Sequence, residues 1–92
     1  MAKYTYNDLK LDNIMINRKT MRTALIDFGF IKPFVGADGE HINKESKRDT
    51  FEGNMLFSSL NQLQFRSTSR RDDLQSLSYL MIYLLNDLSF PY

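Results

Sequence analysis

The sequence contains no cysteine and only one histidine. The absence of cysteine excludes a disulfide framework and any cysteine-based metal site. His41 has no acidic or histidine partner at ligand spacing, so we expect it to lie in a solvated loop. The 12 basic and 11 acidic residues leave a formal net charge of +1, which implies neither a nucleic-acid partner nor an acidic membrane surface.

Long hydrophobic runs are also lacking. The longest, from Tyr79 to Leu85, is far shorter than a membrane span. The first ten residues, MAKYTYNDLK, contain no apolar stretch of the kind found in secretory signals. We therefore expect no membrane partner, and the cytoplasm or nucleus is the default location because no targeting signal is seen.

The composition is that of an ordinary globular chain. The 92 residues, 42% of them hydrophobic and 25% charged, fit one small domain or part of a larger one. Apolar runs at 14–17 and 23–28, joined by a polar turn, predict a β-hairpin. Residues 35–53 form a polar loop, and a loop of this length is either functional or disordered. Helical spacing predicts a short helix over 58–65 and a long one over about 70–86, so the fold class is α+β.

The long helix is apolar around its whole second half. Its leucines and Met81 recur at helical spacing, and its other face carries Tyr79, Leu80, Ile82 and Tyr83. This is the pattern of a helix that is buried on every side. A chain of this length has few elements to surround it, so the pattern favours a helix that packs against more protein than is present here. Ser69 and Asp72 resemble a capping box at its start.

Polar side chains gather beside the predicted hairpin. Asn13 directly precedes the first strand and Asp27 lies in the second, so the hairpin brings them to the same end. An amide oxygen and a carboxylate suit Mg²⁺ when phosphate completes the coordination. Lys10 can hold a phosphate oxygen as a point charge, and Asp8 can accept a hydrogen bond from an incoming hydroxyl. Together these side chains suit phosphoryl transfer.

Two motifs carry a resemblance to a known family. DLKLDN at 8–13 followed by DFG at 27–29 resembles the catalytic loop and metal-binding segment of protein kinases. GNMLFSSLNQ at 53–62 and SRRDDLQSL at 69–77 resemble the casein kinase 1 family, whose members read G-T-x-x-Y-x-S-x-N and S-R-R-D-D-L-E-S-L-G there. The resemblance covers about residues 4–92. It implies a partial protein kinase domain over 1–92, a piece of the C-terminal lobe with its catalytic loop at 6–13.

The resemblance implies an ATP- and Mg²⁺-dependent Ser/Thr protein kinase whose partner is a protein with a Ser/Thr acceptor. Asp8 would be the catalytic aspartate that contacts the substrate hydroxyl. Lys10 would contact the transferring phosphate. Asn13 and Asp27 would bind Mg²⁺, so that Lys10, Asn13 and Asp27 together hold the cofactor.

The resemblance also implies structural roles. Phe28 would pack to set the active arrangement, and Gly29 would let the backbone turn. Residues 27–61 would form the activation segment. Asp73 would accept hydrogen bonds from the backbone of the catalytic loop. The apolar helix would be the buried centre of the lobe.

Several positions depart from the family. Tyr6 replaces the usual His, and Asn7 replaces an Arg that would pair with a phosphate on the activation segment, so no control through that pair is expected. Gly53 keeps the family glycine, but Asn54 replaces the Thr whose hydroxyl bridges the catalytic Asp and Lys. Leu56 replaces an Arg that helps the family bind anionic, pre-phosphorylated substrates, so no preference for such substrates is expected.

The largest departure is an absence. No Gly-rich phosphate loop, V-A-I-K lysine or helix glutamate precedes Tyr4. The missing N-terminal lobe of a parent chain is therefore an expected partner, and the chain alone is expected to be inactive. The alternative is a pseudokinase or truncated kinase fragment that acts as a non-catalytic binding module. Asn7 and Asn54 favour that alternative, whereas the retained Asp8, Lys10, Asn13 and Asp27 favour the kinase.

Overall fold

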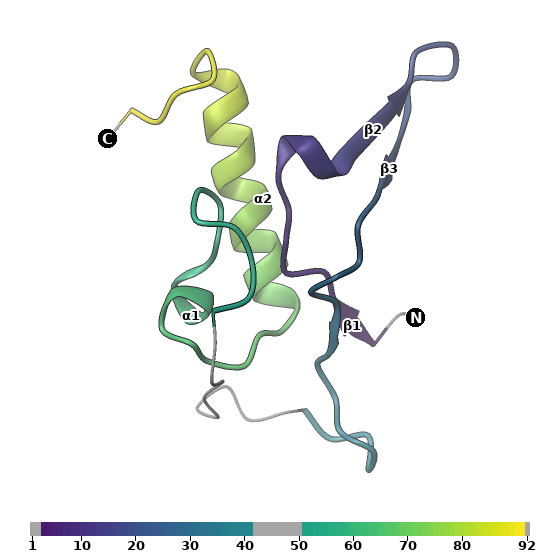
Figure 1. The fold of residues 1–92 in the computed structure, drawn as a ribbon, viewed down its shortest axis with the longest axis vertical. Coiled ribbons are helices and arrows are strands. Elements are labelled where there is room, and N and C mark those ends of the chain that lie inside the picture. The colour runs from purple at the N-terminus through teal and green to yellow at the C-terminus, as the bar shows by residue number, and fades with distance from the viewer. Residues whose placement is uncertain (1–2, 42–50, 92) are drawn as a thin grey trace.

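The computed structural model describes residues 3–41 and 51–91, which form a small α+β arrangement of two short sheets and two helices. It measures 42 × 33 × 18 Å along its principal axes. The strands come first and the helices follow (Figure 1). In chain order the elements are β1 (Tyr4–Thr5), the 3₁₀ helix η1 (Leu11–Asn13), β2 (Ile14–Asn17), β3 (Arg22–Leu25), β4 (Lys32–Pro33), α1 (Leu60–Leu63) and α2 (Arg70–Leu85).

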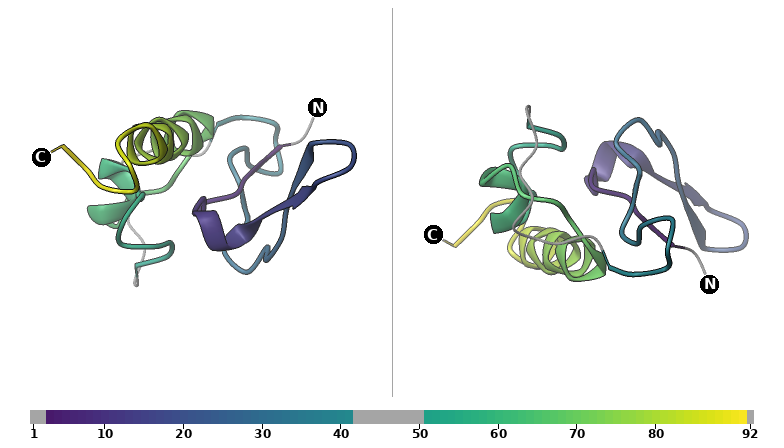
Figure 2. Two further views of the ribbon diagram at one scale, coloured as in Figure 1. Left: turned by 90° about the horizontal axis from the view of Figure 1, so that it is seen from above. Right: turned by 90° about the horizontal axis from the view of Figure 1, so that it is seen from below.

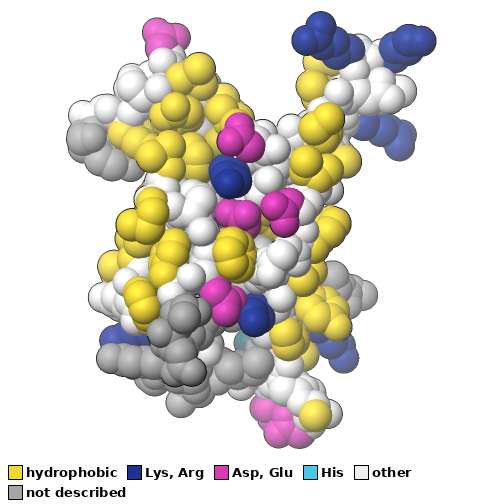
Figure 3. Space-filling view, viewed as in Figure 1, with side chains coloured by type: hydrophobic (Ala, Val, Ile, Leu, Met, Phe, Trp, Pro, Cys, Tyr) yellow, Lys and Arg dark blue, Asp and Glu magenta, His cyan; other side chains and the backbone are white. Residues whose placement is uncertain are grey.

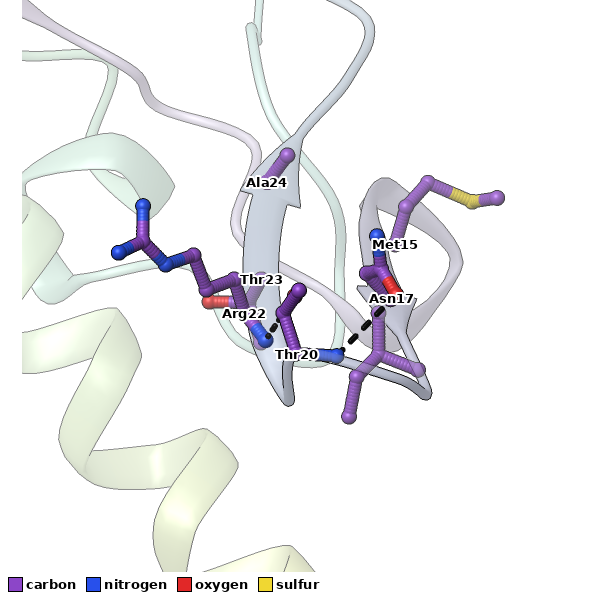
Figure 4. Close-up of a pocket in the computed structure, with 7 residues that line it drawn as sticks. Met15, Asn17, Thr20, Arg22, Thr23 and Ala24 are labelled. Carbon is purple, nitrogen blue, oxygen red and sulfur yellow. Dashed lines mark hydrogen bonds between the residues drawn. The ribbon is translucent and has the colours of Figure 1, made fainter.

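The predicted hairpin is present as β2 and β3, which pair antiparallel with Ile14 opposite Leu25. Its turn is organised by Asn17, whose Oδ1 accepts hydrogen bonds from the N–H groups of Lys19 at 3.0 Å and Thr20 at 3.3 Å. Side chains of this turn and its strands, including Met15, Thr20 and Arg22, line an open hollow of about 790 Å³ beside the hairpin (Figure 4). None of the predicted site residues borders this hollow.

The predicted second strand, 23–28, is too long. Strand β3 ends at Leu25, and the last bond to the neighbouring strand runs from the N–H of Ile26 to the carbonyl oxygen of Asn13 at 3.0 Å. Asp27 then takes a left-handed backbone with φ of 60°, which ends the extended conformation. Periodicity alone did not reveal this reversal.

A second sheet was not predicted from the sequence. Tyr4 pairs with Pro33 and Thr5 with Lys32, so the polar start of the chain lies beside the segment that follows D-F-G. Two-residue strands have too few side chains to show an alternating pattern. Proline is tolerated in Pro33's position because its missing N–H is not needed at the edge of a sheet.

Both helices begin at capping boxes. Ser69 and Asp72 form the predicted box at the start of α2, which ends one residue before the predicted limit. Ser59 and Gln62 form a second box at α1, which the sequence analysis did not identify. Helix α1 is shorter than the predicted 58–65 because Phe65 has a φ of 61° and ends the helical conformation.

Helix α2 is buried along one stripe only, which agrees with the expectation that it packs against more protein than is present here. Its buried side chains are Asp72, Ser76 and Leu80, which lie on one stripe of the helix. Leu74 and Leu85 are 63% and 85% exposed because the described residues cover only that stripe. The views along the helix show α1 on one side of it and the hairpin well apart (Figure 2).

The apolar core is small. Among the described residues, the buried hydrophobic side chains are those of Tyr6, Phe34, Phe57 and Leu80. Phe57 packs with Tyr83 and Phe90, with ring centroids 5.3 and 5.8 Å apart. No helix in the described part of the chain is long and apolar enough to cross a membrane.

Candidate active site

The segment from Tyr6 to Asn13 is held in place from the start of α2. The carboxylate of Asp73 accepts hydrogen bonds from the N–H of Tyr6 at 2.7 Å and from the N–H of Asn7 at 2.9 Å. Burial raises the pKa of Asp73, while these two N–H donors act in the opposite direction. The hydrogen bonds are those expected of Asp73, and they fix the backbone immediately before Asp8.

Asp8 lies between two asparagine side chains. The Nδ2 of Asn13 donates to the carbonyl oxygen and to the Oδ2 of Asp8, both at 2.9 Å. The Nδ2 of Asn54 donates to the Oδ1 of Asp8 at 3.3 Å and to the carbonyl oxygen of Leu9 at 3.1 Å. Asp8 and Asn13 are each 5% exposed, so these bonds replace water around a buried carboxylate. They also fix the direction in which the carboxylate faces.

Asp27 reaches the same end of the hairpin as Asn13. The Ile26 N–H bond to Asn13 ties the two segments together, and the hydroxyl of Tyr6 donates to the carbonyl oxygen of Ile26. The pKa of Tyr6 is raised by burial first, and then by the negative charges of Asp8 and Asp27. Both carboxylates therefore act on one hydroxyl, which joins the segment 6–13 to the segment just before Asp27.

The D-F-G residues are exposed in this chain. The Oδ1 of Asp27 accepts a hydrogen bond from the N–H of Gly29 at 3.1 Å, which stabilises the turn. The ring of Phe28 packs edge-on against Tyr6, with centroids 5.8 Å apart, although Phe28 remains 56% exposed. Tyr6 therefore provides a contact between the predicted catalytic loop and Phe28.

Asn7 joins more segments than the sequence indicated. Its backbone is left-handed, with a φ of 71°, a conformation that asparagine tolerates better than most residues. Its Nδ2 donates to the carbonyl oxygen of Phe30 at 2.9 Å, and its Oδ1 accepts from Thr68 at 2.7 Å. Its carbonyl oxygen accepts from the Nε2 of Gln62 at 2.7 Å. Because Asn7 is 2% exposed, a neutral side chain suits this position.

The sequence analysis did not identify Gln62 or Thr68 as residues of this site. Gln62 also donates to the carbonyl oxygen of Glu52 at 3.1 Å, so it links the segment before Gly53 to Asn7. Its position three residues after Ser59 is a capping-box pattern and could have placed it at the start of a helix. Thr68 had no comparable signal.

Gly53 occupies a crowded position. Its φ is 140°, and a Cβ at this position would lie 2.6 Å from the Nε2 of Gln62 and 2.9 Å from the carbonyl oxygen of Asn7. Only glycine combines this backbone conformation with such close packing. Gly53 thus lets the chain approach Asn7 closely enough for Asn54 to reach Asp8.

Lys10 is half-buried and borders a cavity of about 390 Å³ that Asp12 and Asn54 also line. Acidic and basic side chains lie together in the middle of the face shown in Figure 3, between hydrophobic groups over α2 and over the hairpin. Residues 42–50, part of the predicted activation segment 27–61, lie outside the described residues. The two described parts of that segment, 27–41 and 51–61, are linked by an ion pair between Lys32 and Glu52 at 3.5 Å.

The side chains fit a magnesium ion that is shared with phosphate. Because Asn13 directs its side-chain nitrogen toward Asp8, its side-chain oxygen Oδ1 is the atom suited to a cation. Asp27 is exposed and supplies a carboxylate at the same end of the hairpin. The described residues contain no group of three or more His, Cys, Asp or Glu side chains that could enclose a metal. Two oxygen ligands completed by phosphate and water are typical of Mg²⁺ rather than of a site built wholly from protein.

Comparison with known proteins gives casein kinase I homologues and other serine/threonine-protein kinases among the relatives, and no protein-family model matches the chain. A probable casein kinase I homolog of Encephalitozoon cuniculi is 37% identical over 79 residues, which are 86% of this chain and 24% of that protein. Casein kinase I homolog 2 of Schizosaccharomyces pombe is 34% identical over 84 residues, 87% of this chain and 19% of the relative. A probable serine/threonine-protein kinase of fowlpox virus is 35% identical over 80 residues, 85% of this chain and 26% of the relative. The chain thus spans about a quarter of the length of these curated relatives or less.

Proposed function

Because this chain is one part of a casein kinase I-type kinase domain, we propose that it carries the catalytic loop and metal-binding side chains of a Ser/Thr protein kinase. In the full-length kinase it would serve transfer of the γ-phosphate of ATP to a serine or threonine hydroxyl of a protein. The observation that carries the proposal is the pair of hydrogen bonds from Asn13 to Asp8. The carbonyl oxygen of Asn13 also accepts the N–H of Ile26, the residue before Asp27.

Each side chain would have one task. Asp8, held by Asn13 and Asn54, would accept a hydrogen bond from the acceptor hydroxyl and orient its oxygen toward the phosphate. Lys10 would place its positive charge beside the transferring phosphate. Asn13 and Asp27 would hold Mg²⁺, which when bound neutralises charge on the phosphate oxygens. Catalysis would thus depend on positioning and charge rather than on a covalent intermediate.

Asn54 would perform part of the task that a threonine hydroxyl performs in the family. Its Nδ2 donates to Asp8, while its Oδ1 accepts from the N–H of Phe57 at 2.7 Å. The amide therefore keeps one donor for the aspartate and uses its acceptor to stabilise its own turn. This arrangement supports a catalytic reading of Asp8, because the carboxylate keeps a donor partner despite the substitution.

The chain by itself is expected to be inactive, because it has only about a quarter of the length of the kinases it resembles. Mixing the chain with Mg-ATP and a serine-rich protein should give no phosphate transfer. Transfer that disappears in Asp27→Asn would contradict this expectation. The function of the site is tested in a chimera in which residues 4–91 replace the matching segment of a casein kinase I homologue. The chimera should be active, and Asp8→Asn and Asp27→Asn should each abolish its activity.

A non-catalytic binding module is the second candidate. The exposed apolar side chains of α2, such as Leu74 and Leu85, favour it because such surface is usually covered by protein. The same chimera separates the two candidates. A chimera that folds but transfers no phosphate would favour the binding module.

A further inference from the structure

The buried side chain of Gln62 makes three hydrogen bonds to the backbone of other segments. Its Nε2 donates to the carbonyl oxygen of Asn7 at 2.7 Å and to that of Glu52 at 3.1 Å. Its Oε1 accepts the N–H of Ser59 at 2.9 Å, as part of the capping box of α1. Because the amide has one accepting atom and one donating atom, the bond from Ser59 fixes which of them faces the two carbonyl oxygens. The start of α1 thus orients a pair of donors.

The two carbonyl groups that Gln62 holds belong to segments that meet at the proposed active site. Asn7 precedes Asp8, and Glu52 lies two positions before Asn54. One amide group therefore fixes the separation between the backbone of Asp8 and the backbone of Asn54. The bond from Asn54 to the carboxylate of Asp8 is 3.3 Å long, at the upper end of the range for such bonds, so a small separation of the segments would break it.

The other donor to the carboxylate of Asp8 is positioned independently of Gln62. Asn13 ends the 3₁₀ helix η1, only five residues after Asp8, and reaches it within one continuous loop. Asn54 is 46 positions from Asp8 in the chain and reaches it from another segment. Loosening the contacts of Gln62 should therefore move Asn54 away from Asp8 while Asn13 stays in place. The two asparagines provide a comparison within one molecule.

We propose that Gln62 is a positioning residue of the proposed active site, whose amide holds Asn54 at the distance from which it donates to Asp8. The inference rests on the proposed function, in which Asp8 orients the acceptor hydroxyl, and it names how that aspartate is kept in place. The ion pair between Glu52 and Lys32, at 3.5 Å, also connects this segment to the rest of the chain. Because that pair is partly exposed, it contributes too little to replace the contacts of Gln62.

The experiment measures by NMR how fast the side-chain amide protons of Asn54 and Asn13 exchange with water in the chain itself. Gln62→Glu keeps an oxygen for the N–H of Ser59, since glutamate is usual at this position of a capping box, but it removes both donors. Exchange at Asn54 should become faster on the order of tenfold, as expected when one hydrogen bond is lost, and exchange at Asn13 should not change. General loosening of the fold would accelerate both.

Two further variants separate the donors from the added charge and from the capping of α1. Gln62→Met adds no charge and keeps an unbranched side chain, so it should give the same selective acceleration at Asn54. Gln75→Glu is the matched control. The Oε1 of Gln75, which is exposed on α2, accepts the N–H of Leu60 at 2.9 Å, and a glutamate would keep that bond. This variant should change neither exchange rate.

The chimera that carries residues 4–91 tests the consequence for catalysis. Gln62→Met should lower kcat about ten- to hundredfold, the factor expected when a hydrogen bond to a charged group is lost in the transition state. The KM for ATP should not change, because Asn13 and Asp27 are held by other contacts. An unchanged kcat, or a change in the KM for ATP alone, would overturn the positioning role.

The exchange measurement has its own contradicting results. Equal acceleration at Asn54 and Asn13, no acceleration in either Gln62 variant, or acceleration at Asn54 in Gln75→Glu would each overturn the inference. If neither Gln62 variant folds, the unmodified chain decides. Nuclear Overhauser contacts between the Gln62 side-chain amide and the α protons of Gly53 are then required, because a Cβ at Gly53 would lie 2.6 Å from the Nε2 of Gln62. The exchange measurement involves neither nucleotide nor metal, so its failure is distinct from failure of the proposed phosphoryl transfer.

Discussion

Asn13 donates two side-chain hydrogen bonds to Asp8, one to the backbone carbonyl oxygen and one to the carboxylate, each at 2.9 Å. The two residues are five positions apart, and η1 curls the chain so that they meet. This contact orients the proposed catalytic carboxylate and, at the same time, leaves the amide oxygen of Asn13 for a cation. In the proposed mechanism, Asn13 thus links the side chain that would bind the acceptor hydroxyl to the side chains that would bind the metal.

Replacing Asn13 with alanine should destabilise the chain by about 2 kcal/mol, because it removes two hydrogen bonds from a buried partner, one of them to a charged group. Urea denaturation followed by circular dichroism measures the change. Asn17→Ala is the matched control, since Asn17 accepts its turn bonds at an exposed position and its loss should cost less than about 1 kcal/mol. Equal losses in both variants would contradict a special role for the Asn13 contact.

Gly53→Ala should destabilise the chain by about 3 kcal/mol or more, because a φ of 140° and the contact with Gln62 add to one another. Gly39→Ala provides the comparison. Gly39 also has a positive φ, 82°, but a Cβ there would meet nothing within 4 Å, so only backbone strain of about 1 kcal/mol is expected. Thermal melts of the two variants would test the close approach of Gly53 to Asn7, and identical melts would refute it.

The stability of the chain should depend on the titration of Asp73. Burial raises the pKa of this carboxyl above its ordinary value of 3.8, so the folded state holds the proton more tightly than the unfolded state does. The resulting stabilisation is complete below pH 3.8 and is lost as the pH rises through the raised value. The stability advantage of the wild type over Asp73→Asn should therefore shrink as the pH rises across this window. Urea midpoints measured across the window would test it, and an advantage that grows with pH would show that the N–H donors outweigh burial.

Leu80→Ala should cost about 2 to 5 kcal/mol, because Leu80 is 2% exposed and its removal leaves a cavity. Leu85→Ala, on the same helix but 85% exposed, should change stability by less than about 0.5 kcal/mol. With so few buried apolar side chains the chain is expected to be marginally stable, so both variants are best compared in trimethylamine N-oxide, which strengthens burial. Similar losses would mean that Leu85 is covered in solution.

The sequence predicted the parts of the fold that depend on local chemistry. The hairpin follows from two apolar runs joined by a polar turn, and the start of α2 follows from the Ser69 capping box. The pairing of Tyr4 with Pro33 depends on contacts between distant segments, which no local pattern records. The apolar pattern of α2 shows what the helix prefers to contact, whereas its burial depends on which protein is present, and the described residues cover one stripe of it.

In the candidate site, too, local patterns were predictable from the sequence and contacts between distant segments were not. Asp8, Asn13 and Asp27 were recognisable because their spacing around the hairpin predicts a shared end. Asn7 was read only as the loss of a positive charge. Its four hydrogen-bonded partners could not be inferred, because they come from segments up to 66 residues away.

Binding of Mn²⁺ in the presence of ATP tests the central claim most directly, since the paramagnetic ion broadens the NMR signals of nearby amides. We predict that the signals of Asn13 and Asp27 broaden first, that signals at the hairpin turn near Lys19 persist, and that Asp27→Asn abolishes the selective broadening. Broadening that appears first around Asp38 and Glu40, or that is unchanged in Asp27→Asn, would contradict the assignment of the metal to Asn13 and Asp27.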